Sequence, residues 1–247
     1  RLYLLTSNDV KPIHIGAGHR FFSYFCRKQI KEMNKFCNPV THIFFFLFLL
    51  AFDLAAKAQP TFNPDSLRES DLLFAYVPKG NAITKVTQGI YGTTIDHVGI
   101  VIRKDKRWQI LEAIHRGVVI TPLDSFINRN TTANCPPSII QGRVTGDVDI
   151  PSSIRNAMHD IGRPYDFYFM PDDREIYCSE LVQKNYVDHS GHLIFQPIPM
   201  SFHDRKGHIL HYWKKYYQKA GLSVPEGKPG SNPGELSRSS RIRIIKS

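Results

Sequence analysis

The chain has 247 residues, of which 42% are hydrophobic and 22% charged, proportions typical of a globular protein and unlike those of disordered or low-complexity chains. Its formal net charge of +10 comes from the two ends, because residues 204–247 alone carry net +7 while residues 59–203 are close to neutral. No nucleic-acid-binding motif accompanies the basic residues, so we exclude a nucleic-acid partner; the basic C-terminal part predicts either an ordinary solvated surface or peripheral contact with an anionic membrane or cell-wall surface.

The N-terminal part has the pattern of a secretory signal peptide. Residues 33–58 contain the basic Lys35, an apolar run at 43–54 and a small-x-small sequence that ends at Ala58. The apolar run is shorter than the roughly 20 residues needed to cross a bilayer. We therefore predict cleavage near Ala58 and export to the periplasm or the extracellular space, with an uncleaved membrane anchor and a buried helix as alternatives. Residues 1–32 are then a non-native or disordered extension outside the fold.

The next part of the chain predicts strands joined by short turns. Alternating and β-branched apolar residues predict strands at 71–76, 97–102, 108–113 and 117–120. A weaker helical pattern covers residues 82–91, with Gly92 as its stop. Thr121 as the N-cap and Pro122 at the first helical position predict the start of another helix.

The last part predicts mainly helices. A strand at 138–144 precedes predicted helices at 151–161, 178–187 and 209–220. Gly162 and Gly221 close the first and last of these helices, and the Gly-, Pro- and Ser-rich end of the chain is predicted to be irregular. Helices that flank a mostly antiparallel sheet make an α+β fold. We expect one catalytic domain at 59–234, followed by a basic C-terminal tail at 235–247.

Cys178 and His97 together predict a nucleophile and a base. A thiol becomes a fast nucleophile where an imidazolium or a helix N-terminus stabilises its thiolate. Cys178 begins a predicted helix that has Glu180 in its first turn, where the helix dipole favours a carboxylate. His97 opens the strand at 97–102 and so lies on a rigid element.

Glu112 is the candidate for a third catalytic residue. A two-residue turn at Lys104 and Asp105, or a four-residue turn at 103–106, places Glu112 directly opposite His97 on the same sheet face. A carboxylate there orients the imidazole. A three-residue turn places Glu112 on the other face, so this prediction depends on the turn.

Tyr165 is a candidate for stabilising an oxyanion. Gly162 and Pro164 indicate a sharp turn shortly before the nucleophile, and the Tyr165 hydroxyl and the backbone N–H of Cys178 are suitable donors to a tetrahedral intermediate. The alternative is an ordinary packed aromatic side chain. Asp166 is expected to cap the turn.

These residues, in this order along the chain, resemble the YiiX/YaeF-like permuted papain-like amidases, relatives of the NlpC/P60 cell-wall hydrolases. The resemblance rests on Asp-His-Val-Gly-Ile-Val at 96–101, Leu-Glu-Ala at 111–113, Gly-x-Pro-Tyr-Asp at 162–166 and Tyr-Cys-Ser-Glu-Leu-Val at 177–182. It spans residues 71–234. The departures are Ser70, where relatives tend to have glycine, and Asp96 before the histidine.

The resemblance implies a circularly permuted papain-like (NlpC/P60-type) fold, in which the histidine precedes the cysteine. It implies Cys178 as nucleophile, His97 as general base and then acid, Glu112 as the orienting residue and Tyr165 in the oxyanion site. The expected activity is that of a secreted thiol hydrolase that cleaves an amide bond through a thioester.

The expected substrate is a peptide, a peptidoglycan stem peptide, or an N-acyl or lipid amide. We expect no metal and no cofactor, because thiol chemistry needs neither. The alternative from another class is a catalytically inactive, secreted binding module with a papain-like shell. In that module Cys178 forms a disulfide with Cys135, since an oxidising compartment favours such bonds.

Overall fold

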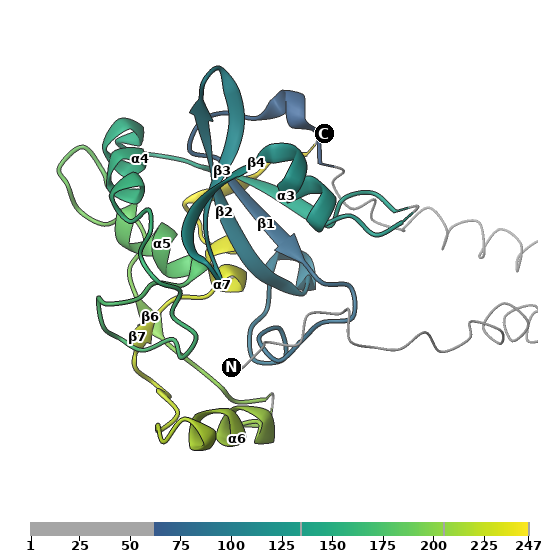
Figure 1. Ribbon diagram of the computed structural model, residues 1–247, viewed down its shortest axis with the longest axis vertical. Coiled ribbons are helices and arrows are strands. Elements are labelled where there is room, and N and C mark those ends of the chain that lie inside the picture. Colours follow the sequence, from purple (N-terminus) through teal and green to yellow (C-terminus); the bar gives the residue numbers. More distant parts are fainter. Residues whose placement is uncertain (1–61, 134, 205, 247) are drawn as a thin grey trace, which may run out of the picture. The chain divides into compact units, whose positions relative to one another are not determined.

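The computed structural model of the protein describes residues 62–133, 135–204 and 206–246 (Figure 1). The predicted signal peptide at 33–58 and the extension at 1–32 lie outside these residues. Within the described ranges, none of the helices has the length and apolar character needed to span a membrane.

A six-stranded antiparallel sheet, in the order β4-β3-β2-β1-β5-β8, forms the centre of the domain (Figure 1). Its strands are β1 (Leu72–Tyr76), β2 (Ile95–Lys104), β3 (Arg107–Ile114), β4 (Gly117–Pro122), β5 (Ile139–Val144) and β8 (Ile242–Ile244). Two short strands, β6 (Ile198–Pro199) and β7 (Pro229–Gly230), pair separately. Each predicted strand is present. β2, β3 and β4 extend two to four residues beyond the predicted ranges, whereas β1 and β5 begin one residue later than predicted.

Helices flank this sheet, which confirms the predicted α+β class. They are α3 (Leu123–Arg129), α4 (Ile150–His159), α5 (Cys178–Asn185), α6 (His211–Lys219) and α7 (Pro233–Ser237), with short 3₁₀ helices η1 (Pro64–Ser66) and η2 (Ile90–Gly92). The Asp149 side chain caps α4 by accepting a hydrogen bond from the Ser152 N–H at 3.0 Å. Gly162 follows α4 with a φ of 86°, a left-handed conformation that glycine adopts without strain.

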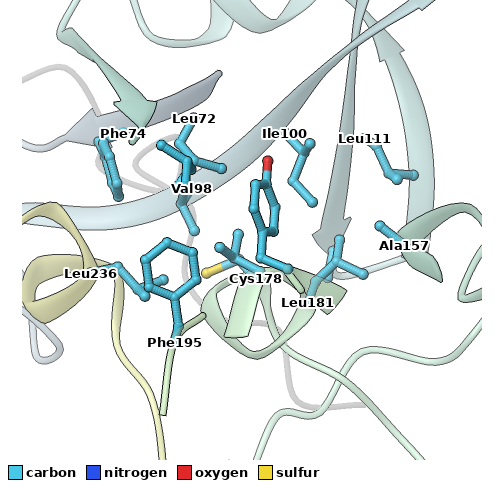
Figure 2. Close-up of a cluster of buried hydrophobic side chains, with 14 of the residues drawn as sticks. Leu72, Phe74, Val98, Ile100, Leu111, Ala157, Cys178, Leu181, Phe195 and Leu236 are labelled. Atoms are coloured by element: carbon cyan, nitrogen blue, oxygen red, sulfur yellow. The ribbon is translucent and has the colours of Figure 1, made fainter. Parts of the chain in front are cut away.

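The sheet buries side chains on both faces, because successive strand residues point to opposite sides. One cluster joins the sheet to α4, α5 and α7 (Figure 2), and its members include Leu72, Val98, Leu111, Ala157, Leu181 and Leu236. The other joins the opposite face to α3, and its members include Leu73, Val101, Ile110 and Phe126. Cys178 belongs to the first cluster (Figure 2).

Residues 82–91 do not form the predicted α-helix. They form hydrogen-bonded turns followed by η2, and Asn81 starts the turns by accepting hydrogen bonds from the N–H groups of Ile83 and Thr84 at 3.0 and 3.1 Å. Five residues of the segment are β-branched: Ile83, Thr84, Val86, Thr87 and Ile90. Such side chains lose rotamer freedom in a helix, so the local preference for a helix is weak.

The C-terminal residues contain regular structure where the sequence predicted an irregular segment. The α7 helix buries Leu236 in the core, and β8 pairs with β5 through Gly142, Arg143 and Val144. A three-residue strand is too short to produce a recognisable period in the sequence. Residues 242–244 therefore form an edge strand of the central sheet.

Candidate active site

Cys178 is the first residue of α5. Tyr177 before it is extended, with φ −104° and ψ 169°, and supplies no side-chain cap, so N–H groups of the first helical turn stay available to a ligand. The residue is 5% exposed and packs against the core side chains that Figure 2 shows around it. Cys178 therefore lies at the positive end of the α5 dipole.

His97 lies between Cys178 and Glu112. Its Nε2 is 2.6 Å from Glu112 Oε2, and its imidazole also hydrogen-bonds the Cys178 side chain. Because Nε2 of His97 is bonded to Glu112, the other ring nitrogen, Nδ1, is the one that can face the sulfur of Cys178. Burial favours the neutral ring, but the hydrogen bonds of the imidazole to Cys178 and Glu112 and the negative charges of these groups outweigh it and raise the pKa of His97 to about 10. His97 is therefore held as an imidazolium.

Glu112 is fully buried and is held by three side-chain partners. Its Oε2 accepts hydrogen bonds from His97 and from Arg129 Nη2 at 2.7 Å, and its Oε1 accepts from Thr121 Oγ1 at 2.6 Å. Burial by itself would raise the pKa of Glu112, but His97 and Arg129 lower it to about 2. The carboxylate is ionised, and the hydrogen bonds to both of its oxygens fix its orientation.

Thr121 and Arg129 are site residues that the sequence analysis missed. Thr121 was predicted to cap α3, but it lies within β4, one residue before the end of that strand, and its hydroxyl donates to Glu112. Pro122 holds the N-cap position. Arg129 lies in the last turn of α3, and nothing in its local sequence relates it to a residue on β3.

The β2–β3 hairpin has a different register from the predicted one. Asp105 and Lys106 form its two-residue turn with φ of 52° and 63°, and Ile100 pairs with Leu111. This register places Gly99 opposite Glu112, so His97 is a diagonal neighbour of Glu112 on the same face. The predicted face is correct, and the predicted directly opposed pair is wrong by two residues.

Gly99 leaves the space through which Glu112 reaches His97. A Cβ atom at Gly99 would lie 2.3 Å from Ile110 Cγ2 and 3.5 Å from Glu112 Cβ. We expect Gly99→Ala to lower the stability of the fold by about 1–3 kcal/mol, the usual cost of overpacking a core, and to weaken the His97–Glu112 contact. Thermal unfolding and hydrolysis rates measure the two effects. Unchanged stability and activity would contradict this account of Gly99.

A β-bulge in β2 places two consecutive residues at the site. Ala75 of β1 pairs with His97 and Tyr76 pairs with Ile95, which leaves Asp96 without a partner on β1. A bulge interrupts the alternation of side chains and changes their direction. Asp96 consequently lines the same pocket as Cys178, while the next residue, His97, hydrogen-bonds that cysteine.

Tyr165 also lines the pocket that contains Cys178. Burial, together with the negative charge of Cys178, raises the pKa of the Tyr165 hydroxyl well above its usual value. The hydroxyl therefore stays protonated and available as a donor. Its ring packs edge-on against Phe167, with centroids 5.0 Å apart, which is the packing considered as the alternative in the sequence analysis.

The rest of the pocket wall is mainly apolar. Its apolar members are Ile83, Val86, Phe169, Met200, Phe202, Trp213 and Pro233. Hydrogen bonds close one side of the pocket, because Tyr177 Oη accepts from the Ser231 N–H at 2.9 Å and the hydroxyls of Ser179 and Ser231 are 3.1 Å apart. The pocket therefore presents a reactive sulfur beside an aromatic and aliphatic surface.

Both described cysteines are free thiols. Cys135 is exposed, whereas Cys178 is buried. The alternative in which Cys178 forms a disulfide with Cys135 therefore does not hold in the structure.

The profile of one protein family matches residues 66–245, and that family is described as permuted papain-like amidase enzymes, YaeF/YiiX, C92 family. A relative, the uncharacterized protein YiiX of Escherichia coli (strain K12), is 29% identical over 111 residues, which are 44% of this chain and 52% of the relative. The chain thus matches about half the length of that protein.

A solved structure has the same fold. It is described as the crystal structure of the metalloprotein yiiX from Escherichia coli O157:H7, and the match has a TM-score of 0.57 at 21% identity over 73% of this chain and 97% of that chain. In the described part of the present chain, no three His, Cys, Asp or Glu side chains are placed together to hold a metal ion.

Proposed function

This chain belongs to the permuted papain-like amidase family of YaeF and YiiX, and from that premise we propose that it hydrolyses amide bonds with Cys178 as its nucleophile. The observation that carries the proposal is the hydrogen-bonded series Cys178, His97 and Glu112. Each member has the chemistry its position requires: a thiol at a helix start, a protonated imidazole and an ionised carboxylate.

The proposed reaction proceeds through a thioester. The Cys178 thiolate attacks the amide carbonyl, and the His97 imidazolium gives its proton to the leaving amine as the C–N bond breaks. His97 then takes a proton from the water molecule that attacks the thioester. Collapse of the second tetrahedral intermediate releases the acid and the Cys178 thiolate, which restores the starting pair with the His97 imidazolium. Glu112 keeps the ring oriented and stabilises its positive charge throughout.

The oxyanion of each tetrahedral intermediate needs donors near the sulfur. We assign this role to the backbone N–H of Cys178 and the Tyr165 hydroxyl, which lines the same pocket. The donor strength of Tyr165 is retained because its raised pKa keeps the proton on oxygen.

The pH dependence of the reaction follows from His97. The imidazolium must be present to protonate the leaving group, and the pKa of His97 is raised from 6.5 to about 10. We expect kcat/KM to fall on the alkaline side with a midpoint near pH 10, because His97 loses its proton there. A pH profile of initial rates measures this midpoint. A midpoint near 6.5 would show that His97 is not held as an imidazolium.

The substrate is expected to place an apolar group against the pocket wall. Peptides and N-acyl or lipid amides both meet this requirement, and peptidoglycan stem peptides are the peptide class that export would bring within reach. Incubation of the protein with muropeptides and with N-acyl amino acids, followed by mass spectrometry of the products, tests the two classes directly. Cleavage of neither class would contradict the proposed substrates.

We also propose that the protein is exported, from the signal-peptide pattern at 33–58. Sequencing of the N-terminus of the exported protein is expected to give Gln59 as the first residue. Retention of the full chain inside cells of the source organism would contradict export.

Peripheral contact with an anionic surface is proposed through the basic C-terminal part. Helix α6 exposes Lys214, Lys215 and Lys219 beside Tyr212, an arrangement suited to lipid headgroups. Co-sedimentation with vesicles that contain phosphatidylglycerol, compared with neutral phosphatidylcholine vesicles, tests this contact. Binding should weaken with salt and in the triple Lys→Gln variant, and equal binding to both kinds of vesicle would contradict it.

A further inference from the structure

Asp96 is a charged residue in the apolar pocket, beside the reactive groups but without a role in the reaction described above. It is the bulged residue of β2 and lines the pocket together with Cys178 and Tyr165. Asn81 Nδ2 donates a hydrogen bond to Asp96 Oδ2 at 2.6 Å, and Asn81 is itself fixed by the N–H groups of Ile83 and Thr84. The carboxylate is therefore held in place at the pocket wall.

The neighbours of Asp96 do not neutralise its charge fully. Beyond Asn81, its own backbone N–H and the charge of His97 stabilise the ionised form, while burial raises the pKa of Asp96. His97 is already engaged by Glu112 and Cys178, and Arg129 by Glu112. In the described part of the chain, the cations near Asp96 are thus already engaged by other groups.

A partly buried carboxylate in an apolar pocket is costly unless a cation or several donors meet it. The described side chains supply one amide donor, and the pocket is open to a ligand. A bound cation would restore the balance of charge and occupy the donor positions that remain on the carboxylate.

We propose that Asp96 selects amide substrates that carry a primary ammonium group close to the scissile carbonyl, with an apolar group of the same substrate packed against the aromatic wall. This inference rests on the proposed hydrolysis by Cys178, and it narrows the substrate class to amines such as aminoacyl amides. Asp96 acts in binding, and the reaction itself stays with Cys178, His97 and Glu112.

The kinetic test compares one substrate with and without its positive charge. Phenylalanine p-nitroanilide has a free ammonium group and an aromatic ring for the wall at Phe169 and Trp213, whereas its N-acetyl derivative lacks the charge. We expect the wild-type protein to prefer the free amine by about 10- to 100-fold in kcat/KM, and Asp96→Asn to abolish that preference by slowing the free amine only. Asp65→Asn changes an exposed carboxylate outside the pocket and should leave both rates unchanged.

Two kinetic results would overturn the proposal. The first is a wild-type protein without preference for the free amine. The second is an equal decrease in kcat/KM for both substrates in the Asp96→Asn variant. That result would mean that Asp96 acts through the neighbouring His97 and contacts no substrate charge.

A binding measurement separates this proposal from the proposed hydrolysis. Trp213 lines the pocket, and with Trp108→Phe it is the sole tryptophan of the chain, so its fluorescence reports occupancy. In the Cys178→Ala protein we expect phenylalaninamide to bind at least about tenfold more tightly than N-acetylphenylalaninamide, and Asp96→Asn to remove the difference. If phenylalaninamide binds more tightly as expected but the wild-type protein hydrolyses no amide, only the proposed reaction is refuted. If the two amides bind equally, the role of Asp96 is refuted.

Discussion

Replacement of Cys178 by Ala should reduce amide hydrolysis by about 10⁴-fold or more, because the covalent step then has no nucleophile. The substitution removes one sulfur atom from a site that is 5% exposed, so we expect a loss of stability of only about 1 kcal/mol. Steady-state kinetics and thermal unfolding of the purified variant measure the two effects. Trapping of the acyl-enzyme on the wild-type protein, with the added mass located on the peptide that contains Cys178, provides direct support.

Cys135→Ala is the matched control for this experiment. It removes the other described thiol, which is exposed and has no place in the pocket. We expect its activity and its unfolding temperature to equal those of the wild type. Persistence of hydrolysis in Cys178→Ala, or its loss in Cys135→Ala, would show that the reaction uses a different nucleophile.

Replacement of Glu112 by Gln should lower kcat by about 10²- to 10⁴-fold, the range expected when an orienting carboxylate loses its charge. The amide keeps the shape of the side chain, but its NH₂ group cannot accept from His97, Arg129 or Thr121 as the carboxylate oxygens do. The pKa of His97 should fall as well, because a negative charge that raises it is gone. The midpoint of the alkaline fall in kcat/KM should therefore move below pH 10 in this variant.

The same variant should change the response of the fold to acid. The pKa of Glu112 is lowered from 4.5 to about 2, so its ion pairs stabilise the fold above pH 4.5 and are lost as the pH falls toward 2. The difference in unfolding temperature between wild type and Glu112→Gln should thus be largest above pH 4.5 and shrink below it. Glu69→Gln, at an exposed carboxylate, serves as the control. A loss of stability that does not depend on pH would show that the charge of Glu112 is not its cause.

The local patterns in the sequence were sufficient to predict most strands of the sheet and the protein family. Apolar runs, which contain β-branched residues in all but β1, predicted β1 to β5, and the motif around Cys178 predicted the start of α5. The family resemblance carried by these motifs is confirmed by the profile match over residues 66–245. The helix expected at 82–91 is absent. The helical propensity of this segment is weak, so its conformation is determined by the hydrogen bonds to Asn81 and by packing in the pocket wall.

Contacts between residues that are distant in the sequence could not be predicted from local patterns. The predicted hairpin register depended on the turn, and only the folded chain shows Asp105 and Lys106 at its centre. Thr121 has the sequence context of a helix cap, yet its hydroxyl donates a hydrogen bond to Glu112. Arg129 reaches the same carboxylate from α3. Each of these contacts joins residues of different elements, about which a local pattern carries no information.

The sequence by itself determined which groups the protein has for chemistry: a thiol at a helix start, an imidazole on a strand and a carboxylate on the next strand. These follow from residue type and periodicity, which act over a few residues. Only the tertiary structure decided that the groups meet, through the bulge at Asp96, the empty space at Gly99 and the packing of α5 on the sheet. The physical reason is that strand pairing, bulges and helix packing are fixed by burial of the whole core, and no segment contains that information alone.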